Sequence, residues 1–273
     1  MTICIAAICS DEHASAGRAV VVASDRMVTM GGLTEFEHEV PKFSSLTSTV
    51  VCLMSGDALR GSQVSRETAV ACASMPGIGV EQVAEHVAQK YAQLRLQLAI
   101  SLNLSPRGLT LEAYYGSQQQ MLGQLVAGID NALATTDFGL ELLIAGVDSD
   151  GGHVFQVGNP GGVAANLAPI GFHAIGSGGL HAIQSMISFR HHPGSQLRDT
   201  VFRVFASKKR AEVAPGVGEN TDLAIITTKG LNVLSDKTLQ NLDEIYEEFR
   251  EPAERRLQEK IDVLVIPGDG END

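Results

Sequence analysis

Runs of apolar residues near the start of the chain, and again after its middle, have the length typical of strands in a sheet. The run 3–9, directly behind Thr2, contains no polar residue and therefore predicts a strand buried on both faces. A polar turn leads to the apolar run 19–24, so the two runs predict a hairpin. With a short β segment at 28–32 and a hairpin that ends with 49–54, they predict a β-meander over the first 57 residues.

The middle of the chain changes to the spacing of amphipathic helices. Residues 58–74 and 80–102 predict two helices, separated by Pro76 and the glycines beside it. Residues 111–133 predict one further long helix with a glutamine-rich face. The second and third of these helices predict an extended antiparallel helical pair over about residues 90–135.

Strand patterns return after residue 140 and alternate with helices. The predicted elements are a hairpin of strands 140–148 and 153–157, a strand 172–175, helices 180–189 and 195–213, a hairpin over 222–234 and a charged helix 236–262. Because hairpins dominate and two groups of helices can cover two outer faces, the sequence predicts an α+β fold. We expect a four-layer αββα sandwich of two mostly antiparallel sheets flanked by helices. It forms a single domain over residues 1–265, followed by an acidic tail at 266–273.

Composition narrows the class of protein. With 273 residues, 44% of them hydrophobic, the chain can bury the core of one large domain. A net charge of −12 argues against nucleic acid and anionic membranes as partners. No apolar run approaches the ~20 residues of a membrane span, and there is no signal-peptide pattern, so we expect a cytoplasmic protein. The four cysteines lack C-x-x-C spacing and read as reduced core thiols, and the eight histidines show no zinc pattern.

Thr2 is the first candidate for chemistry, because it follows the initiator Met1 and opens a buried strand. If Met1 is removed, Thr2 carries a free α-amine next to its β-hydroxyl. An amine beside a hydroxyl is a base beside a nucleophile, which is the N-terminal threonine form of nucleophilic catalysis. Many chains begin Met-Thr, so this motif needs the rest of the sequence to support it.

Five further segments accompany Thr2. They are Ala23-Ser24-Asp25-Arg26, Pro41-Lys42-Phe43, Ser55-Gly56-Asp57, Leu143-Ile144-Ala145-Gly146-Val147-Asp148 and Ile175-Gly176-Ser177-Gly178. These segments occur in the order and spacing seen in proteasome subunits, so the chain resembles that family of N-terminal-nucleophile hydrolases. It looks closest to bacterial proteasome-like proteins of the ancestral-β-subunit (Anbu) type, with no propeptide ahead of the threonine. The resemblance covers most of residues 2–234 and implies the same αββα sandwich.

The resemblance also implies roles for five residues. Thr2 would be the nucleophile, Asp25 and Lys42 its supporting ion pair, Gly56 the backbone donor to the oxyanion, and Ser177 a hydrogen-bond partner near the threonine amine. A chain-terminal amine has a pKa of about 7.7–8.0, and a neighbouring ammonium lowers it, so the amine can act as a base near neutral pH. No cofactor and no metal is implied.

As partners, the resemblance implies self-assembly into a ring or spiral, in which the helical pair packs between subunits, and a peptide or unfolded protein as substrate. It leaves open whether an ATPase takes part. Active proteasome β-subunits usually carry an Asp followed three residues later by Ser-Gly, whereas residues 212–218 here read EVAPGVG, with Glu212 the nearest acid.

Two other functions therefore stay open beside a threonine-type peptidase. One is a catalytically silent structural subunit, and the other is a non-peptidase amidohydrolase of the same superfamily. Gly176-x-Gly178-Gly179 also imitates a dinucleotide-binding fingerprint, but position 181 is His and no βαβ pattern surrounds it.

Overall fold

A computed structural model describes residues 2–12, 17–30, 34–37 and 41–262 of the chain. Met1 and the predicted acidic tail 266–273 lie outside the described residues. The chain divides into two compact units, Met1–Val233 and Leu234–Asp273. Over the described residues the second unit is the helix α7 (Asp236–Ile261), as its charge pattern predicts, and the Ser235 hydroxyl caps it by accepting from the backbone N–H of Thr238.

Two five-stranded sheets form the centre of the first unit, and every neighbouring pair of strands within them is antiparallel. The first sheet has the order β10 (Phe172–Ile175), β1 (Cys4–Ser10), β2 (Arg18–Asp25), β11 (Thr221–Thr227) and β12 (Gly230–Val233). The second has the order β5 (Phe43–Ser45), β6 (Val50–Gly56), β7 (Leu140–Asp148), β8 (Gly151–Val157) and β9 (Ala165–Asn166).

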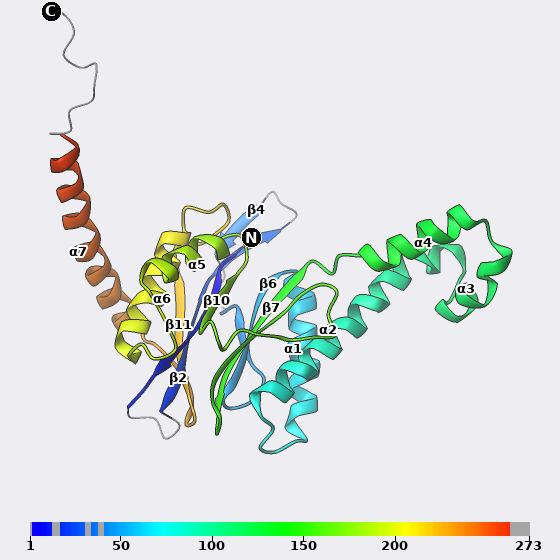
Figure 1. Ribbon diagram of the computed structural model, residues 1–273, viewed down its shortest axis with the longest axis horizontal. Helices are drawn as coiled ribbons and strands as arrows, with labels where there is room; N and C mark the ends of the chain where they lie inside the picture. Colours follow the sequence, from blue (N-terminus) through cyan, green and yellow to red (C-terminus); the bar gives the residue numbers. More distant parts are fainter. Residues whose placement is uncertain (1, 13–16, 31–33, 38–40, 263–273) are drawn as a thin grey trace, which may run out of the picture. The chain divides into compact units, whose positions relative to one another are not determined.

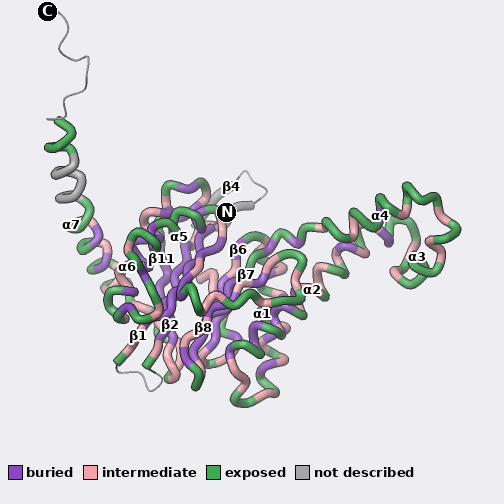
Figure 2. The backbone as a smooth tube through the Cα atoms, viewed as in Figure 1, coloured by how far each residue is buried: buried purple, intermediate pink, exposed green. Residues whose placement is uncertain are grey.

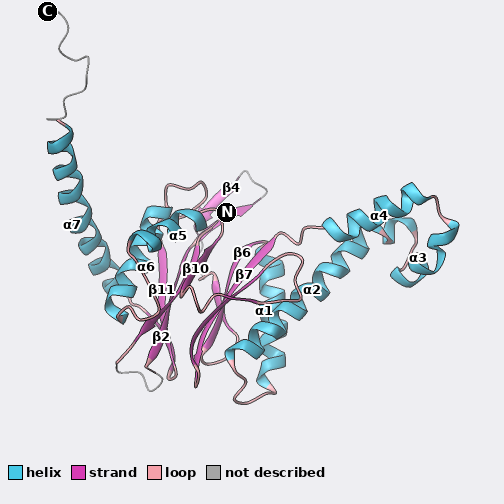
Figure 3. Ribbon diagram, in the orientation of Figure 1, coloured by secondary structure: helices cyan, strands magenta, loops and turns pink. Residues whose placement is uncertain are grey.

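Helices cover the outer face of each sheet, which gives the predicted layers of helix, sheet, sheet and helix (Figures 1 and 3). The first sheet contacts α5 (Gly179–Ser188) and α6 (Leu197–Ala211). The second contacts α1 (Ala58–Ala73) and α2 (Val80–Asn103). The predicted α+β architecture with antiparallel sheets is therefore confirmed. None of the helices in the described part of the chain has the length and apolar character that a membrane crossing requires.

Strand β1 belongs to the first sheet and is buried from Cys4 to Cys9, as its unbroken apolar run predicts (Figure 2). Cys4, Ala6 and Ile8 face the second sheet and belong to the apolar core between the two sheets. The alternate residues of the strand point to the other side, where α5 and α6 contact it. This burial anchors the start of the chain inside the fold, whereas most chain termini are loose.

The β-meander predicted for the first 57 residues is wrong. β1 and β2 pair in the first sheet, whereas β5 and β6 belong to the second. Between them, β3 (Met27–Met30) and β4 (Thr34–Glu37) form a separate two-stranded ribbon, where the sequence had predicted a single β segment and a charged stretch. Apolar patterning shows which residues are buried in strands, but it does not show which of two sheets a hairpin joins.

The helix predicted over 111–133 is also wrong, because three pieces occupy it: α3 (Leu111–Ser117), a 3₁₀ turn (Gln118–Gln120) and α4 (Gly123–Thr135). The Ser117 hydroxyl donates to the Ala113 carbonyl, a bond that competes with the helix, and glycines near both ends of the break lower helix propensity. The break lets α4 turn back along the C-terminal part of α2 and close a small separate core of Leu104, Tyr114 and Ile129. We call this segment, residues 99–135, the arm.

Candidate active site

Thr2, Asp25 and Lys42 meet at one end of the two-sheet sandwich. Thr2 lies just before β1 and Asp25 ends β2, and the register Cys4↔Ser24 brings them side by side in the first sheet. Lys42 comes from the second sheet, directly before β5, where its carbonyl accepts from the N–H of Met54. The Lys42 ammonium and the Asp25 carboxylate both contact the Thr2 hydroxyl, and Lys42 Nζ lies 2.8 Å from Asp25 Oδ1.

The Asp25 side chain is fully buried and satisfied by donors on both oxygens. Its Oδ1 accepts from the Thr2 hydroxyl, Lys42 Nζ and the backbone N–H of Ile3 at 2.9 Å. Its Oδ2 accepts from the N–H groups of Met27, at 3.1 Å, and Gly218, at 3.0 Å. A buried carboxylate is tolerated only when it is paired and hydrogen-bonded, and these donors hold Asp25 in one orientation.

The turn after β10 encloses Thr2 from the other side. The register Cys4↔Ile175 places Ser177 beside Thr2, whose backbone nitrogen lies 3.1 Å from the Ser177 hydroxyl oxygen. The Gly178 N–H donates to the Thr2 carbonyl at 3.2 Å. Gly176 has φ +94°, and a side chain there would overlap that carbonyl. Gly176, the first glycine of the segment that imitates a dinucleotide fingerprint, is thus explained by this close approach to Thr2.

Gly56 ends β6 at the same end of the second sheet, next to the strand that Lys42 precedes. It has φ +103°, and a Cβ there would overlap the carbonyl of Gly139, so the neighbouring backbone requires glycine at this position. The sulfhydryl of Cys4 donates to the Met54 carbonyl at 3.4 Å, which ties this end of β6 to β1. Of the five residues singled out from the sequence, four are joined by direct contacts, and Gly56 is placed at the same edge by strand register.

Glu212 does not stand in for the Asp of the proteasome pattern beside Thr2. Its carboxylate pairs with Lys208 at 2.7 Å and Lys209 at 3.5 Å. The loop that follows nevertheless reaches the site, because the Ser177 hydroxyl lies 3.1 Å from the Pro215 carbonyl oxygen and Gly218 donates to Asp25.

Sequence reasoning missed Lys208, whose side chain is 0% exposed and whose ammonium is surrounded by acceptors. Burial lowers the pKa of Lys208, and the nearby carboxylate of Glu212 opposes that shift. A signal was present in the sequence. Lys208 falls on the buried stripe of α6 between Val204 and Ala211, at a spacing that places all three on one helix face.

The four cysteines are buried and free of disulfides, as the sequence predicts. Burial raises the pKa of Cys9 to about 12 and that of Cys52 to about 11. Burial likewise raises the pKa of Cys4, which lies closest to the site. The hydroxyl of Thr2 therefore has no thiolate competitor at neutral pH among these cysteines.

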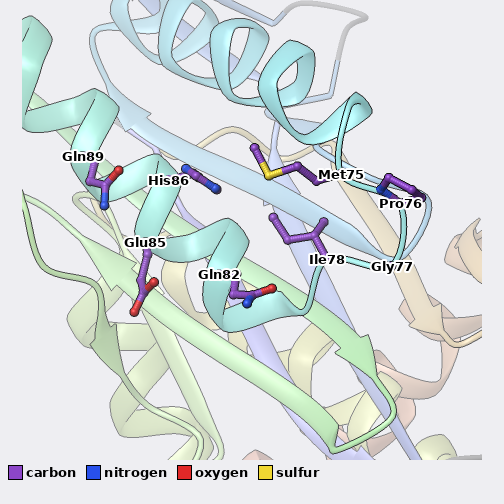
Figure 4. A pocket seen from close by; sticks show the side chains of 8 residues that line it. All are labelled: Met75, Pro76, Gly77, Ile78, Gln82, Glu85, His86 and Gln89. Atoms are coloured by element: carbon purple, nitrogen blue, oxygen red, sulfur yellow. The ribbon is translucent and has the colours of Figure 1, made fainter.

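A surface hollow of ≈ 380 Å³ lies elsewhere, at the turn between α1 and α2 (Figure 4). Its lining comes from residues 75–78 and the first turns of α2, and includes Glu85 and His86. None of the five residues singled out from the sequence, all of which the structure describes, lines it. Within the described residues, no three histidine, cysteine or acidic side chains are grouped as a metal site requires. The convergence of charge around Thr2 is therefore the better guide to chemistry than this hollow.

No protein-family model and no curated protein matches the sequence. The chemistry that the site can perform is therefore inferred from the geometry of its residues. A hydroxyl in contact with a lysine–aspartate pair whose carboxylate is buried can act as a nucleophile, provided that a base accepts its proton. The nitrogen of the same residue lies within the same cluster and becomes an amine once the preceding peptide bond is cut.

Proposed function

We propose that this protein is an N-terminal-threonine amide hydrolase of the proteasome-like N-terminal-nucleophile class, with Thr2 as nucleophile after removal of Met1. One observation carries the proposal: the hydroxyl of Thr2 contacts both members of the Lys42–Asp25 ion pair, whose carboxylate is fully buried. A fully buried carboxylate is costly unless it is paired and hydrogen-bonded, and a hydroxyl held against such a pair is placed as a nucleophile requires.

In the proposed reaction, the Thr2 hydroxyl attacks the carbonyl carbon of an amide while the free α-amine accepts the hydroxyl proton. The amide C–N bond then breaks, and the protonated α-amine returns the proton to the leaving nitrogen. This leaves an ester between Thr2 Oγ1 and the acyl group. The amine next takes a proton from water, whose oxygen attacks the ester, and returns that proton to Thr2 Oγ1 as the acid leaves.

Lys42 supports this chemistry as a fixed positive charge. Its ammonium contacts the hydroxyl oxygen on which negative charge develops as the proton leaves. Asp25 orients Lys42, because its Oδ1 lies 2.8 Å from the ammonium. Ser177 holds the nitrogen of Thr2, and the N–H of Gly56 is the proposed donor to the oxyanion at the end of β6.

The proposed substrate is a peptide or unfolded protein, and the proposed working form is a self-assembled ring or spiral. Large apolar side chains exposed on the helices that cover both sheets support self-association, because a contact between copies would bury them. They are Leu59 and Val70 on α1, and Leu180 and Ile187 on α5.

The test is intact-mass analysis followed by labelling with a peptide epoxyketone, an electrophile that bonds to a hydroxyl and an adjacent free amine. We expect a mass that lacks Met1 and one adduct, which peptide mapping locates at Thr2. Thr2→Ser keeps the hydroxyl and amine and should still react, whereas Thr2→Ala should not. A retained Met1 without an adduct, or an adduct that persists in Thr2→Ala, would refute the proposal.

A second candidate is a catalytically silent subunit that uses the fold for assembly. The observation that favours it is the engagement of Glu212 by Lys208 and Lys209, which leaves the proteasome-type acidic position without contact to Thr2. The same experiment separates the two candidates, because a silent subunit assembles without reacting at Thr2.

A further inference from the structure

The loop between α6 and β11, residues 212–220, is held by one buried cation, the ammonium of Lys208 on α6. Lys208 Nζ donates to Glu212 Oε1 at 2.7 Å, to the Gly218 carbonyl at 2.7 Å and to the Glu219 carbonyl at 2.6 Å. These are the three donors that an ammonium group has. The loop therefore has its two ends, at Glu212 and at residues 218–219, fastened to the same nitrogen atom.

Gly218 connects this cation directly to Asp25. Its carbonyl accepts from Lys208, while its N–H donates to Asp25 Oδ2 at 3.0 Å. Gly218 also lies tightly against Met27, since a Cβ there would come within 3.2 Å of the Met27 nitrogen, the second donor to Asp25 Oδ2. A shift of Gly218 would thus displace one of the two donors to Asp25 Oδ2.

We propose that Lys208 is a positioning residue of the Thr2 centre, which acts through Gly218 to fix the orientation of the Asp25 carboxylate. Resting on the proposed function, this inference assigns Lys208 a part in the reaction although it touches neither Thr2 nor the substrate. Asp25 Oδ1 makes the contacts to Thr2 and Lys42. If Oδ2 loses its donor and the carboxylate rotates, Oδ1 moves as well and both contacts change.

The same loop also contacts the other side of Thr2. The Pro215 carbonyl lies 3.1 Å from the Ser177 hydroxyl, which in turn lies next to the Thr2 nitrogen. By holding both ends of the loop, Lys208 controls contacts on the nucleophile side and on the base side. In this chain a buried lysine below the loop replaces the Asp and Ser-Gly that the proteasome pattern places within it.

The test compares Lys208→Met with a matched lysine that also pairs with a glutamate. Lys90 pairs with Glu67 at 3.2 Å between α1 and α2, so Lys90→Met is the control. Because loss of one partner of a buried pair can prevent folding, the double variant Lys208→Met/Glu212→Gln, which removes both charges, is made as well. Each protein is measured as the full chain after its loss of Met1 is verified by mass.

Two readouts keep the inference separate from the proposed function. The first is amide hydrogen exchange of Gly218, which we expect to accelerate in both Lys208 variants and not in Lys90→Met. The second is epoxyketone labelling, analysed as a reversible binding constant and a rate constant for bond formation. We expect the rate constant to fall roughly 10- to 100-fold, as misplacement of reacting groups typically causes, with the binding constant unchanged.

Each outcome decides one claim. Unchanged exchange at Gly218 overturns the inference, and so does faster exchange with an unchanged rate constant for bond formation. If the wild-type protein does not label at all, the proposed hydrolase is refuted, and the exchange of Gly218 still decides whether Lys208 holds the donor to Asp25. If the Lys208 variants bind the epoxyketone more weakly but form the bond at an unchanged rate, Lys208 has a purely structural role.

Discussion

Gly176 lies against the backbone carbonyl of Thr2 so closely that a methyl group at its Cα would overlap the carbonyl oxygen and come within 2.9 Å of Thr2 Cγ2. This contact places the turn after β10 on top of the proposed nucleophile. It also requires a backbone conformation, φ +94°, that residues with a side chain rarely adopt.

Gly176→Ala should therefore destabilise the protein and slow the labelling of Thr2. Gly108→Ala is the matched control, because Gly108 also has a positive φ, +68°, but no atom within 4 Å of its added Cβ. We expect Gly108→Ala to cost about 1–2 kcal/mol, the backbone strain alone, and Gly176→Ala to cost more because overlap adds to strain. Urea unfolding measures both, and equal losses of stability would show that Gly176 is not packed against Thr2.

Asp25→Asn should cost about 3–5 kcal/mol of stability, as removal of one partner of a buried ion pair typically does. An amide has one acceptor oxygen and presents an N–H₂ group to donors that the carboxylate had satisfied. Asp57→Asn is the control, since Asp57 is 36% exposed and caps α1, a role that asparagine performs equally well. Urea unfolding should separate the two variants clearly; similar midpoints would mean that the Asp25 cluster contributes little.

The pH dependence of stability should reflect His191, which connects the loop after α5 to β1. Its Nε2 lies 3.0 Å from the Ile8 carbonyl oxygen, and its Nδ1 has no hydrogen-bond partner among the described residues. The pKa of His191 is lowered from 6.5 to about 4, mainly by burial; the hydrogen bond with Ile8 opposes this shift, and the nearby Arg203 and His192 add to it.

Between these two values the unfolded chain binds a proton that the native protein does not, so stability falls as the pH falls from about 6.5 to about 4. The contribution lost is on the order of 3 kcal/mol. His191→Gln should flatten this part of the pH profile in urea unfolding, whereas His192→Gln, at an exposed neighbour that makes only a minor contribution to the shift, should change the profile much less. An identical profile in wild type and His191→Gln would contradict the assignment.

The arm should open independently of the sandwich, because its core consists of only three buried residues. Ile129→Ala removes one of them, and we expect a local loss of about 2–5 kcal/mol, seen as faster amide exchange near Leu104 and Tyr114 with exchange in β1 and β7 unchanged. Leu143→Ala, in the core between the two sheets, is the control and should accelerate exchange in both sheets. Faster exchange in β1 caused by Ile129→Ala would show that the arm and the sandwich unfold as one unit.

Some elements could be predicted from the sequence because their signal is local. The buried run behind Thr2 became β1, and the alternation around the turn at 149–152 became the β7–β8 hairpin. The break between α3 and α4 was missed, since a helical period alone does not register the competing bond from Ser117 or the turn that its packing requires.

The candidate site residues Thr2, Asp25 and Lys42 were singled out by the resemblance to proteasome subunits, and they stand at or near strand ends that the apolar pattern marks. Lys208 was missed although its spacing from Val204 and Ala211 places it on the buried face of α6, because a lysine in a helix is ordinarily a solvated residue.

By itself the sequence determined where strands and helices form and which side chains are able to do chemistry, because both follow from the local order of apolar, polar and turn residues. The tertiary structure alone decided that Lys42, from the second sheet, reaches a hydroxyl and a carboxylate of the first, and that Lys208 lies beneath the loop donating to that carboxylate. These contacts join residues 10 to 193 positions apart in the chain. Most of them arise when two sheets and their helices pack together, which no short stretch of sequence specifies.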